Sequence, residues 1–210
     1  MPVRNRIVIG IAVALLLITG LAACRSHVLK GPETDEEKAF LASLPGEIVY
    51  AHRDEGILNI HKINANGTNN KLLYHNDMPE YNRNSFMPLW SEDGTKIYFT
   101  AMKDDKWRKF VMDNVELVED EEPYWGTLSS REPDIIVRLG DVFWKDAEGG
   151  LHQVYDYPFH AENDTASRHA HWGPDKKFII FVTALHNIMV VNREGTILVK
   201  VTDGEFPDWK

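Results

Sequence analysis

Two stretches of the chain differ in how apolar and polar residues are arranged. Residues 7–21 form an almost uncharged apolar run, and no run like it recurs later in the sequence. From about residue 47 onward, short runs of β-branched and aromatic residues alternate with turns rich in Gly, Asp and Asn. Runs of this length are typical of strands, and no long helical period is present. The second stretch therefore predicts an all-β domain.

A tether and a short helix are predicted between these stretches. Thr34 suits the N-cap position, and the acidic residues that follow it suit the positive end of the helix dipole. Pro45 and Gly46 end the helix. Because a helix this short frays alone, we expect Phe40 and Leu41 to pack against the domain that follows.

An internal repeat favours a propeller over a sandwich or barrel. Four units can be superimposed, each of which opens with an apolar triplet and closes on a tryptophan. The triplets begin at Ile48, Ile97, Ile135 and Ile179, and the tryptophans are Trp90, Trp125, Trp172 and Trp209. One unit cannot bury both of its faces, so units must stack, with a tryptophan filling the space between neighbours. The sequence predicts a small β-propeller of about four blades over residues 47–210, as a closed ring or an open arc. An ordinary meander or sandwich is the alternative.

The repeat also resembles a known family. The segment Met87-Pro-Leu-Trp-Ser-Glu-Asp-Gly-Thr-Lys-Ile-Tyr-Phe99 is similar to the TolB-type β-propeller repeat, and the segment 63–69 is similar to its hairpin turn. The resemblance covers roughly residues 47–209. The second unit departs from it, because it lacks the glycine hairpin and is followed by an extra stretch at 126–134. The resemblance implies a propeller that acts chiefly through contacts with other proteins.

The repeat predicts how the propeller closes. An open propeller leaves unpaired strand edges, so the first strand should complete the last blade. We expect Ile48–Tyr50 to pair within the blade built from residues 179–209, although two chains completing a larger ring is an alternative. We also expect Trp90, Trp172 and Trp209 to be buried between blades.

The N-terminal apolar run is predicted to be a signal peptide. Arg4 and Arg6 precede it, and it is short for a bilayer span. It closes on Leu21-Ala-Ala-Cys24, which resembles the bacterial lipobox, and Cys24 is the only cysteine. In proteins with a lipobox the signal is cut before the cysteine, whose thiol takes a diacylglycerol. The resemblance implies that residues 1–23 are a signal peptide and that residues 24–46 are a lipidated tether with the short helix. A retained transmembrane anchor is the alternative.

The lipobox also implies a location. The residue after Cys24 is Arg25 and not Asp, which is the usual signal for retention at the inner membrane. In a host with two membranes, the resemblance implies a protein anchored in the outer membrane and facing the periplasm.

The charge of the chain limits its partners. The formal net charge is −9 at pH 7, and no basic cluster is present. Because phosphate contacts need Lys and Arg, this balance excludes a nucleic-acid partner. An acidic surface is also repelled by anionic headgroups, so the lipid rather than the protein surface is expected to hold the chain to the membrane.

Histidines are the candidates for metal chemistry. His169 and His171 would point the same way on a strand, so they could bind a metal together with His160 or Asp164. The alternative is that they are surface histidines or pack beside Trp172. The chain contains no Gly-x-Ser-x-Gly elbow, phosphate loop or paired-cysteine site, so the motifs assign no catalytic residue and no cofactor.

Two functions follow from these observations. The first is a lipid-anchored propeller that binds another protein of the cell envelope without catalysis. The second is a metal-dependent lyase or hydrolase that acts on a glycan through His160, His169 and His171. The first is favoured, because no nucleophile, base and orienting group can be assembled from the sequence.

Overall fold

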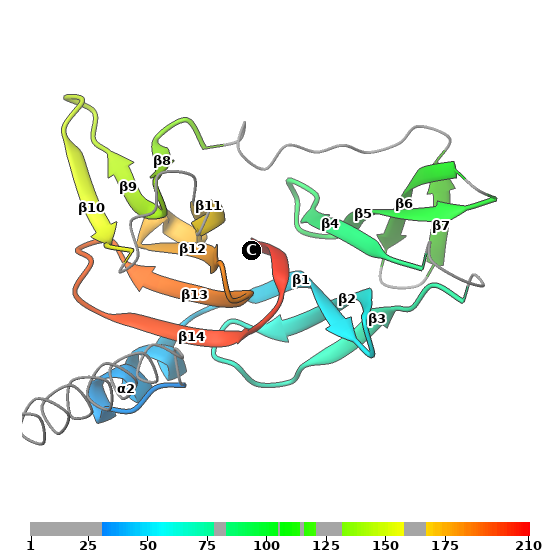
Figure 1. Cartoon of the computed structure of the whole chain (residues 1–210), viewed down its shortest axis with the longest axis horizontal. Coiled ribbons are helices and arrows are strands. Elements are labelled where there is room, and N and C mark those ends of the chain that lie inside the picture. Colours follow the sequence, from blue (N-terminus) through cyan, green and yellow to red (C-terminus); the bar gives the residue numbers. More distant parts are fainter. Residues whose placement is uncertain (1–30, 78–82, 105, 114–115, 121–131, 158–166) are drawn as a thin grey trace, which may run out of the picture. The chain divides into compact units, whose positions relative to one another are not determined.

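The computed structural model describes residues 31–77, 83–104, 106–113, 116–120, 132–157 and 167–210 (Figure 1). All of them belong to one compact unit, Gly31–Lys210. Within this part of the chain, no helix is long and apolar enough to cross a membrane. The apolar run at 7–21, Cys24 and Trp125 lie outside the described residues, so the predictions that rest on them stay predictions.

The short helix forms where the sequence predicts it. Helix α2 (Asp35–Ser43) begins after Thr34, whose hydroxyl accepts a hydrogen bond from the backbone N–H of Glu37 at 3.1 Å. The Glu37 carboxylate in turn accepts one from the N–H of Thr34 at 2.9 Å. This reciprocal capping satisfies N–H groups that the start of a helix otherwise leaves open. Phe40 and Leu41 pack against the buried core, which confirms the predicted docking.

The described strands form four antiparallel sheets, so the prediction of an all-β domain is confirmed (Figure 1). Sheet 1 has the order β15-β1-β2-β3, with β15 (Glu205–Trp209), β1 (Glu47–Asp54), β2 (Ile57–Asn64) and β3 (Lys71–Tyr74). Sheet 2 has the order of β4 (Ser85–Trp90), β5 (Ile97–Lys103), β6 (Lys106–Asp113) and β7 (Glu116–Asp120). Sheet 3 contains β8 (Ile135–Arg138), β9 (Asp141–Lys145) and β10 (Leu151–Tyr155). Sheet 4 has the order of β11 (Ser167–Trp172), β12 (Phe178–Thr183), β13 (Asn187–Asn192) and β14 (Leu198–Asp203), with a 3-10 turn η2 (Pro174–Lys176) after β11.

Sheets 1, 2 and 4 begin with a strand that ends in tryptophan. These strands are β15, β4 and β11, and we call them the inner strands because each is the first in its sheet and β15 contacts the other two. The next strand in each sheet carries the apolar triplet of the repeat, in β1, β5 and β12. In sheet 3 the triplet lies in β8. Each sequence unit therefore supplies most of one sheet, but the tryptophan strand that closes the unit is the first strand of the next sheet.

The first and last strands of the domain pair with each other. β1 and β15 are antiparallel, with Ile48 opposite Trp209 and Val49 opposite Asp208. The expected pairing of Ile48–Tyr50 with the C-terminal segment is confirmed, but the expected blade is wrong. Strands β12–β14 pair with β11, whereas β15 belongs to sheet 1. The reason is that each tryptophan strand begins a sheet, so β15 joins the three strands β1–β3.

Two apolar clusters join sheet 1 to its neighbours. β1 contributes to both, because alternate side chains of a strand face opposite sides. Ile48 and Tyr50 face sheet 4, and Val49 faces sheet 2. The first cluster also contains Ile63, Ile180, Val182, Ile188, Val190, Val199 and Trp209. The second also contains Ile60, Trp90, Ile97, Phe99, Ala101 and Phe110. The core therefore lies between the sheets and not within one of them.

Each described tryptophan of the repeat packs against the neighbouring sheet. Trp90 of sheet 2 packs on sheet 1, and Trp209 of sheet 1 packs on sheet 4. The ring of Trp172 in sheet 4 lies 6.0 Å from that of Trp144 in sheet 3. The three inner-strand tryptophans are only 5–6% exposed, which confirms their predicted burial. Four small antiparallel sheets stacked in this way are propeller-like. No closed ring is found among the described residues, which leave out the segment 121–131.

Candidate functional site

The three inner strands share a backbone irregularity at the same distance from their tryptophans. Met87, His169 and Phe206 each lie three residues before the tryptophan, with φ values of 54°, 53° and 52°. At the same place the pairing of each inner strand with its neighbour shifts register. The left-handed conformation costs an L residue roughly 1–2 kcal/mol, and such residues concentrate at functional sites.

This repeated bulge accounts for the proline that precedes most of the tryptophans. Pro88 and Pro207 follow the residue with positive φ, and Ala170 has the same place in β11. Proline has no N–H to donate, so it fits where the hydrogen-bond ladder is interrupted. The sequence showed the proline spacing, but Met, His and Phe give no turn signal, so the bulge could not be predicted.

A pocket of about 260 Å³ opens where the ends of the inner strands meet. Trp90, Trp172 and Trp209 line it, and we call it the tryptophan pocket. These residues come from three different sheets, and Glu132, which also lines the pocket, lies shortly before β8 of sheet 3. The pocket therefore exists only when the sheets are assembled.

The tryptophan pocket is acidic and partly polar. Glu92, Glu132 and Asp208 line it, and Lys210 supplies the one Lys or Arg side chain among its described lining residues. Asp208 is only 7% exposed, and its carboxylate accepts a hydrogen bond from the backbone N–H of Trp90 at 2.6 Å. A buried carboxylate is thus held on an inner strand by the backbone of the neighbouring one.

His171 is a second buried polar residue of the pocket. Its Nε2 lies 2.8 Å from the carbonyl oxygen of Pro207 and 4.0 Å from the carboxylate of Asp208. Its Nδ1 lies 3.1 Å from the carbonyl oxygen of Trp172. These contacts hold the imidazole between the inner strands β11 and β15.

The indole N–H groups of two pocket tryptophans join neighbouring parts of the fold. Trp172 Nε1 donates to Asp134 at 3.0 Å, and Trp209 Nε1 donates to the carbonyl oxygen of Pro45 at 2.8 Å. The buried Nε1 of Trp90 has no hydrogen-bond partner within the described part of the chain.

Cations already lie over the aromatic rings of this region. The Lys210 ammonium is 3.7 Å from the centre of the Trp90 ring, and it also lies 2.6 Å from the carbonyl oxygen of Gly94. The Arg193 guanidinium lies 4.0 Å from the Trp144 ring centre. Both contacts are cation–π interactions, which favour a positive charge on the face of an indole.

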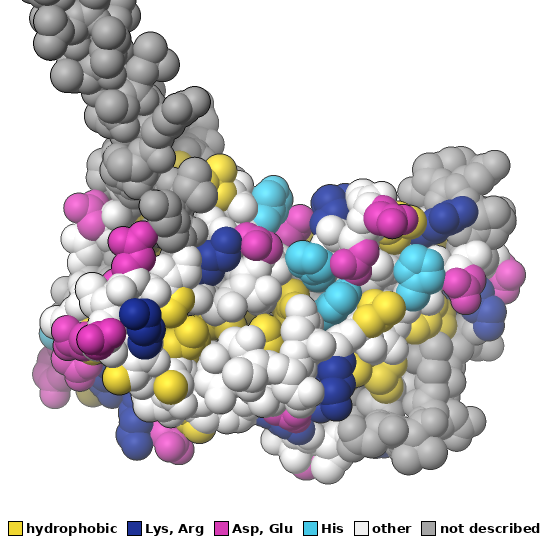
Figure 2. Space-filling model, turned by 90° about the horizontal axis from the view of Figure 1, so that it is seen from below, with side chains coloured by type: hydrophobic (Ala, Val, Ile, Leu, Met, Phe, Trp, Pro, Cys, Tyr) yellow, Lys and Arg dark blue, Asp and Glu magenta, His cyan; other side chains and the backbone are white. Residues whose placement is uncertain are grey.

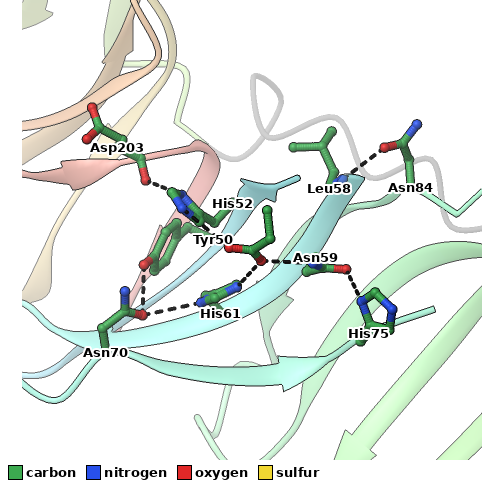
Figure 3. A network of polar contacts seen from close by, with 10 residues as sticks. Tyr50, His52, Leu58, Asn59, His61, Asn70, His75, Asn84 and Asp203 are labelled. Carbon is green, nitrogen blue, oxygen red and sulfur yellow. Dashed lines mark hydrogen bonds and ion pairs between the residues drawn. The ribbon is translucent and has the colours of Figure 1, made fainter. Parts of the chain in front are cut away.

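A second polar site lies on sheet 1, around Asp54, and Figure 3 labels His52, Asn59 and His61 of this site. The Asp54 carboxylate accepts a hydrogen bond from Asn59 Nδ2 at 2.8 Å, and the same oxygen lies 2.8 Å from His61 Nε2. The other oxygen lies 3.6 Å from His52 Nε2. His52 Nδ1 is in turn 3.0 Å from the carbonyl oxygen of Asp203, which precedes the turn into β15.

The contacts around Asp54 extend from β1 and β2 to the residues on either side of β3. Asn70 Oδ1 accepts a hydrogen bond from the Tyr50 hydroxyl at 2.9 Å, and His75 Nδ1 lies 3.0 Å from Asn59 Oδ1 (Figure 3). Histidines gather beside acidic side chains on the face shown in Figure 2. We call the set Tyr50, His52, Asp54, Asn59, His61, Asn70 and His75 the Asp54 network. No motif marks its members, because they come from β1, from β2 and from the residues on either side of β3, and the strand register brings them together.

Comparisons with known proteins leave the family open. No family model and no curated protein matches the chain. Among solved structures, it is similar to TolB from Acinetobacter baumannii at 13% identity and a TM-score of 0.32, over 78% of this chain and 43% of that one. It is also similar to a putative TolB from Agrobacterium tumefaciens at 14% identity and a TM-score of 0.30, over 76% of this chain and 63% of that one. The chain thus spans less than two thirds of either structure.

The fold is propeller-like. This statement rests on the four described sheets and their equivalent tryptophans, and the finer TolB-type resemblance stays a prediction from the repeat.

Of the histidines named as candidate metal ligands, His169 and His171 lie on β11, and the metal site stays a prediction. His169 has a positive φ and lies at the register shift of β11, so regular strand alternation does not apply to it and His171. The His169 ring packs 4.5 Å from that of Phe206. His160 lies outside the described residues. In the described ranges, no three His, Cys, Asp or Glu side chains are arranged so that they could hold a metal ion.

The environment of Asp54 makes its carboxylate a stronger acid. Burial alone would raise its pKa, but the hydrogen bonds from Asn59 and His61 outweigh burial, so the pKa lies below its ordinary value. A carboxyl group whose pKa is lowered by folding stabilises the protein above its unfolded-state pKa. That stability is lost as the pH falls through the folded-state pKa.

We therefore expect Asp54→Asn to lower the free energy of unfolding at pH 6 by about 1–2 kcal/mol, the value of a partly exposed charge-assisted hydrogen bond. The difference from the wild type should shrink as the pH falls from 5 to 2, because Asp54 then becomes protonated. Urea unfolding at several pH values measures this. Asp77→Asn is the matched control, since Asp77 is almost fully exposed and 3.8 Å from His75. A difference that stays constant down to pH 2 would contradict the assignment.

Proposed function

We propose that the chain is a protein-binding module of a bacterial cell envelope and that the partner contacts the tryptophan pocket. The observation that supports this is the meeting of Trp90, Trp172 and Trp209 around one pocket. Binding energy at protein interfaces is concentrated in residues such as Trp, Tyr and Arg, at well-packed pockets. The pocket volume of about 260 Å³ is just below the roughly 300–1,000 Å³ of small-molecule sites, and it suits one or two side chains of a partner.

The rim of the pocket is held in place before binding. Glu92 lies in the turn after β4, where the Asp93 carboxylate accepts hydrogen bonds from the Ser91 hydroxyl at 2.6 Å and the Thr95 backbone N–H at 3.0 Å. These bonds lower the pKa of Asp93 to about 2. A rim that is already ordered loses little conformational entropy when a partner binds, which favours its use in recognition.

Photo-crosslinking in the native envelope tests the proposal. A photoreactive amino acid replaces the exposed Glu92 at the pocket. The matched control carries it at the exposed Glu55, in the turn between β1 and β2, at the end of β1 away from Trp209. We expect a specific crosslinked protein from position 92 and none from position 55, identified by mass spectrometry. Equal crosslinking from both positions would contradict the pocket as the contact site.

The proposal includes attachment to the membrane through Cys24. The lipobox-like segment at residues 21–24 supports it, together with the fact that Cys24 is the only cysteine. Arg25 in place of Asp supports the outer membrane, with the domain in the periplasm. Stable anchoring needs more than one acyl chain, which a bacterial lipoprotein carries.

We expect Cys24→Ser to abolish labelling by a fatty-acid analogue and to leave an uncut precursor. Without the thiol, no diacylglycerol can be attached and the signal peptidase has no substrate. Metabolic labelling followed by gel electrophoresis measures both effects. Ser26→Ala is the control, because it changes a neighbouring residue and leaves the thiol intact. Labelling that is unchanged in Cys24→Ser would exclude the lipoprotein.

A further inference from the structure

Helix α2 makes its polar contacts within itself. Lys38 pairs with Asp35 at 3.4 Å inside the helix. The Ser43 hydroxyl also donates inside it, to the carbonyl oxygen of Phe40 at 2.7 Å. Among the described residues, no hydrogen bond or ion pair joins residues 35–43 to one of the sheets. The helix is therefore held on the domain by apolar contacts alone.

The chain is fastened to the sheets from Leu44 onward. Leu44 is 5% exposed and belongs to the first apolar cluster. The carbonyl oxygen of Pro45 accepts a hydrogen bond from Trp209, and that of Gly46 accepts one from the backbone N–H of Ala65 at 3.1 Å. The change from an apolar attachment to a hydrogen-bonded one thus falls at the end of α2.

Two side chains supply the apolar attachment. No residue of α2 is buried, and Phe40 and Leu41 are half-buried where they pack on the first cluster. The Phe40 ring meets that of Phe178 edge-on, with 5.8 Å between the ring centres, and the helix lies beside β14 (Figure 1). Phe178 also stacks on Trp209 at 5.7 Å, so the surface under α2 is supported from within the domain.

A segment attached in this way can leave without unfolding the rest. The helix has nine residues, and isolated helices shorter than about 12–15 residues are marginal in water. Parts of a protein with few buried apolar contacts open locally at a much lower cost in free energy than global unfolding. Release of α2 breaks two apolar contacts and none of the bonds that fasten the chain after Leu44.

We propose that α2 is a releasable arm, which leaves β14 while the sheets stay folded and so lengthens the tether between the domain and its lipid. This rests on the proposed function, because it takes the lipid on Cys24 as the anchor. With α2 docked, the free tether is residues 25–34, and with α2 released it is residues 25–43. An extended chain spans about 3.3–3.6 Å per residue, so the greatest reach rises from roughly 35 Å to roughly 65 Å.

Hydrogen–deuterium exchange of the full-length protein in detergent micelles tests the release. We expect the amides of residues 39–43 to exchange at least about a hundredfold faster than those of β1, because α2 opens locally. The double variant Phe40→Ala with Leu41→Ala should speed this exchange further, since alanine keeps the helix propensity and removes the attachment. Its melting midpoint should fall by less than about 4 °C, because the sheets stay folded.

A distance measurement follows the arm itself. Spin labels on non-natural amino acids replace the exposed Glu36 of α2 and the exposed Glu194 in the turn before β14. We expect the wild type to show a short separation and a long, broad one, and the variant with Phe40→Ala and Leu41→Ala to keep only the long one. The matched control is Ala39→Ser with Ala42→Ser, which changes two exposed positions of the same helix and should keep both separations.

Amides of residues 39–43 that exchange only as fast as those of β1 would overturn the proposal, because α2 would then leave only when the whole domain unfolds. So would a single separation shared by the wild type and the variant with Phe40→Ala and Leu41→Ala. Fatty-acid labelling separates this inference from the proposed function. A released arm in a chain whose Cys24 carries no lipid removes the anchor, whereas a lipid on Cys24 with a fixed α2 removes only the arm.

Discussion

Replacing Trp209 with alanine should lower the free energy of unfolding by about 3–5 kcal/mol, the usual cost of removing a buried tryptophan side chain. The side chain is 6% exposed and its ring stacks 5.7 Å from that of Phe178. Its indole also donates a hydrogen bond to Pro45. Because Trp209 belongs to sheet 1 and packs on sheet 4, the cavity falls on the contact between two sheets. Small domains are stable by about 5–15 kcal/mol, so the loss is a large part of the total.

Thermal and urea unfolding of three variants separate the contribution of the Trp209 ring from that of its hydrogen bond. Trp209→Phe keeps most of the ring and loses the hydrogen bond, so it should cost only about 1–2 kcal/mol. Trp107→Ala is the control, because Trp107 is a half-buried tryptophan on β6 whose ring packs against Phe86 of the same sheet. A Trp209→Ala variant that unfolds like the wild type would show that this ring does not join sheets 1 and 4.

Removal of residues 205–210 should have a still larger effect, namely the loss of a cooperative unfolding transition. Strand β15 pairs with β1 and contacts both β4 and β12, so three sheets lose a shared strand. The carboxylate of Asp208 also leaves the backbone N–H of Trp90, which stays buried without its acceptor. The exposed edge of β1 would then be open to pairing with other molecules.

A synthetic peptide can supply the strand that this truncation removes. A peptide of residues 203–210 added to the truncated protein should restore the far-ultraviolet circular dichroism and the monomeric state, and the peptide with Trp209 replaced by alanine should do so poorly. Size-exclusion chromatography reports the association state. A truncated protein that stays monomeric and unfolds like the full chain would mean that β15 does not hold the sheets together.

Much of the fold could be predicted because its signals are local or periodic. The alternation of apolar runs and turns predicted the strands, and the recurring tryptophans predicted which residues fill the spaces between sheets. Thr34 and the acids after it predicted the helix start. The sheet to which β15 belongs was predicted wrongly, since the repeat in the sequence does not say where one sheet ends and the next begins.

The candidate site could not be predicted, because it depends on contacts between distant residues. The hydrogen bond from the Trp90 backbone to Asp208 joins residues 118 positions apart. The bulges at Met87, His169 and Phe206 share geometry but no residue type, so no motif marks them. The chemistry predicted from the sequence rested on His169 and His171, which lie close together in the sequence and flank the bulge in β11.

The pairing of β1 with β15 also sets the order in which this protein can fold. Residues 45 and 209, which share a hydrogen bond, are separated by 164 positions, and closing a loop of that length costs on the order of 4–5 kcal/mol of chain entropy. Proteins dominated by such distant contacts fold slowly. Sheet 1 stays incomplete until residues 205–209 have left the ribosome. Until then the edge of β1 is unpaired, so it is open to pairing with strands of other molecules.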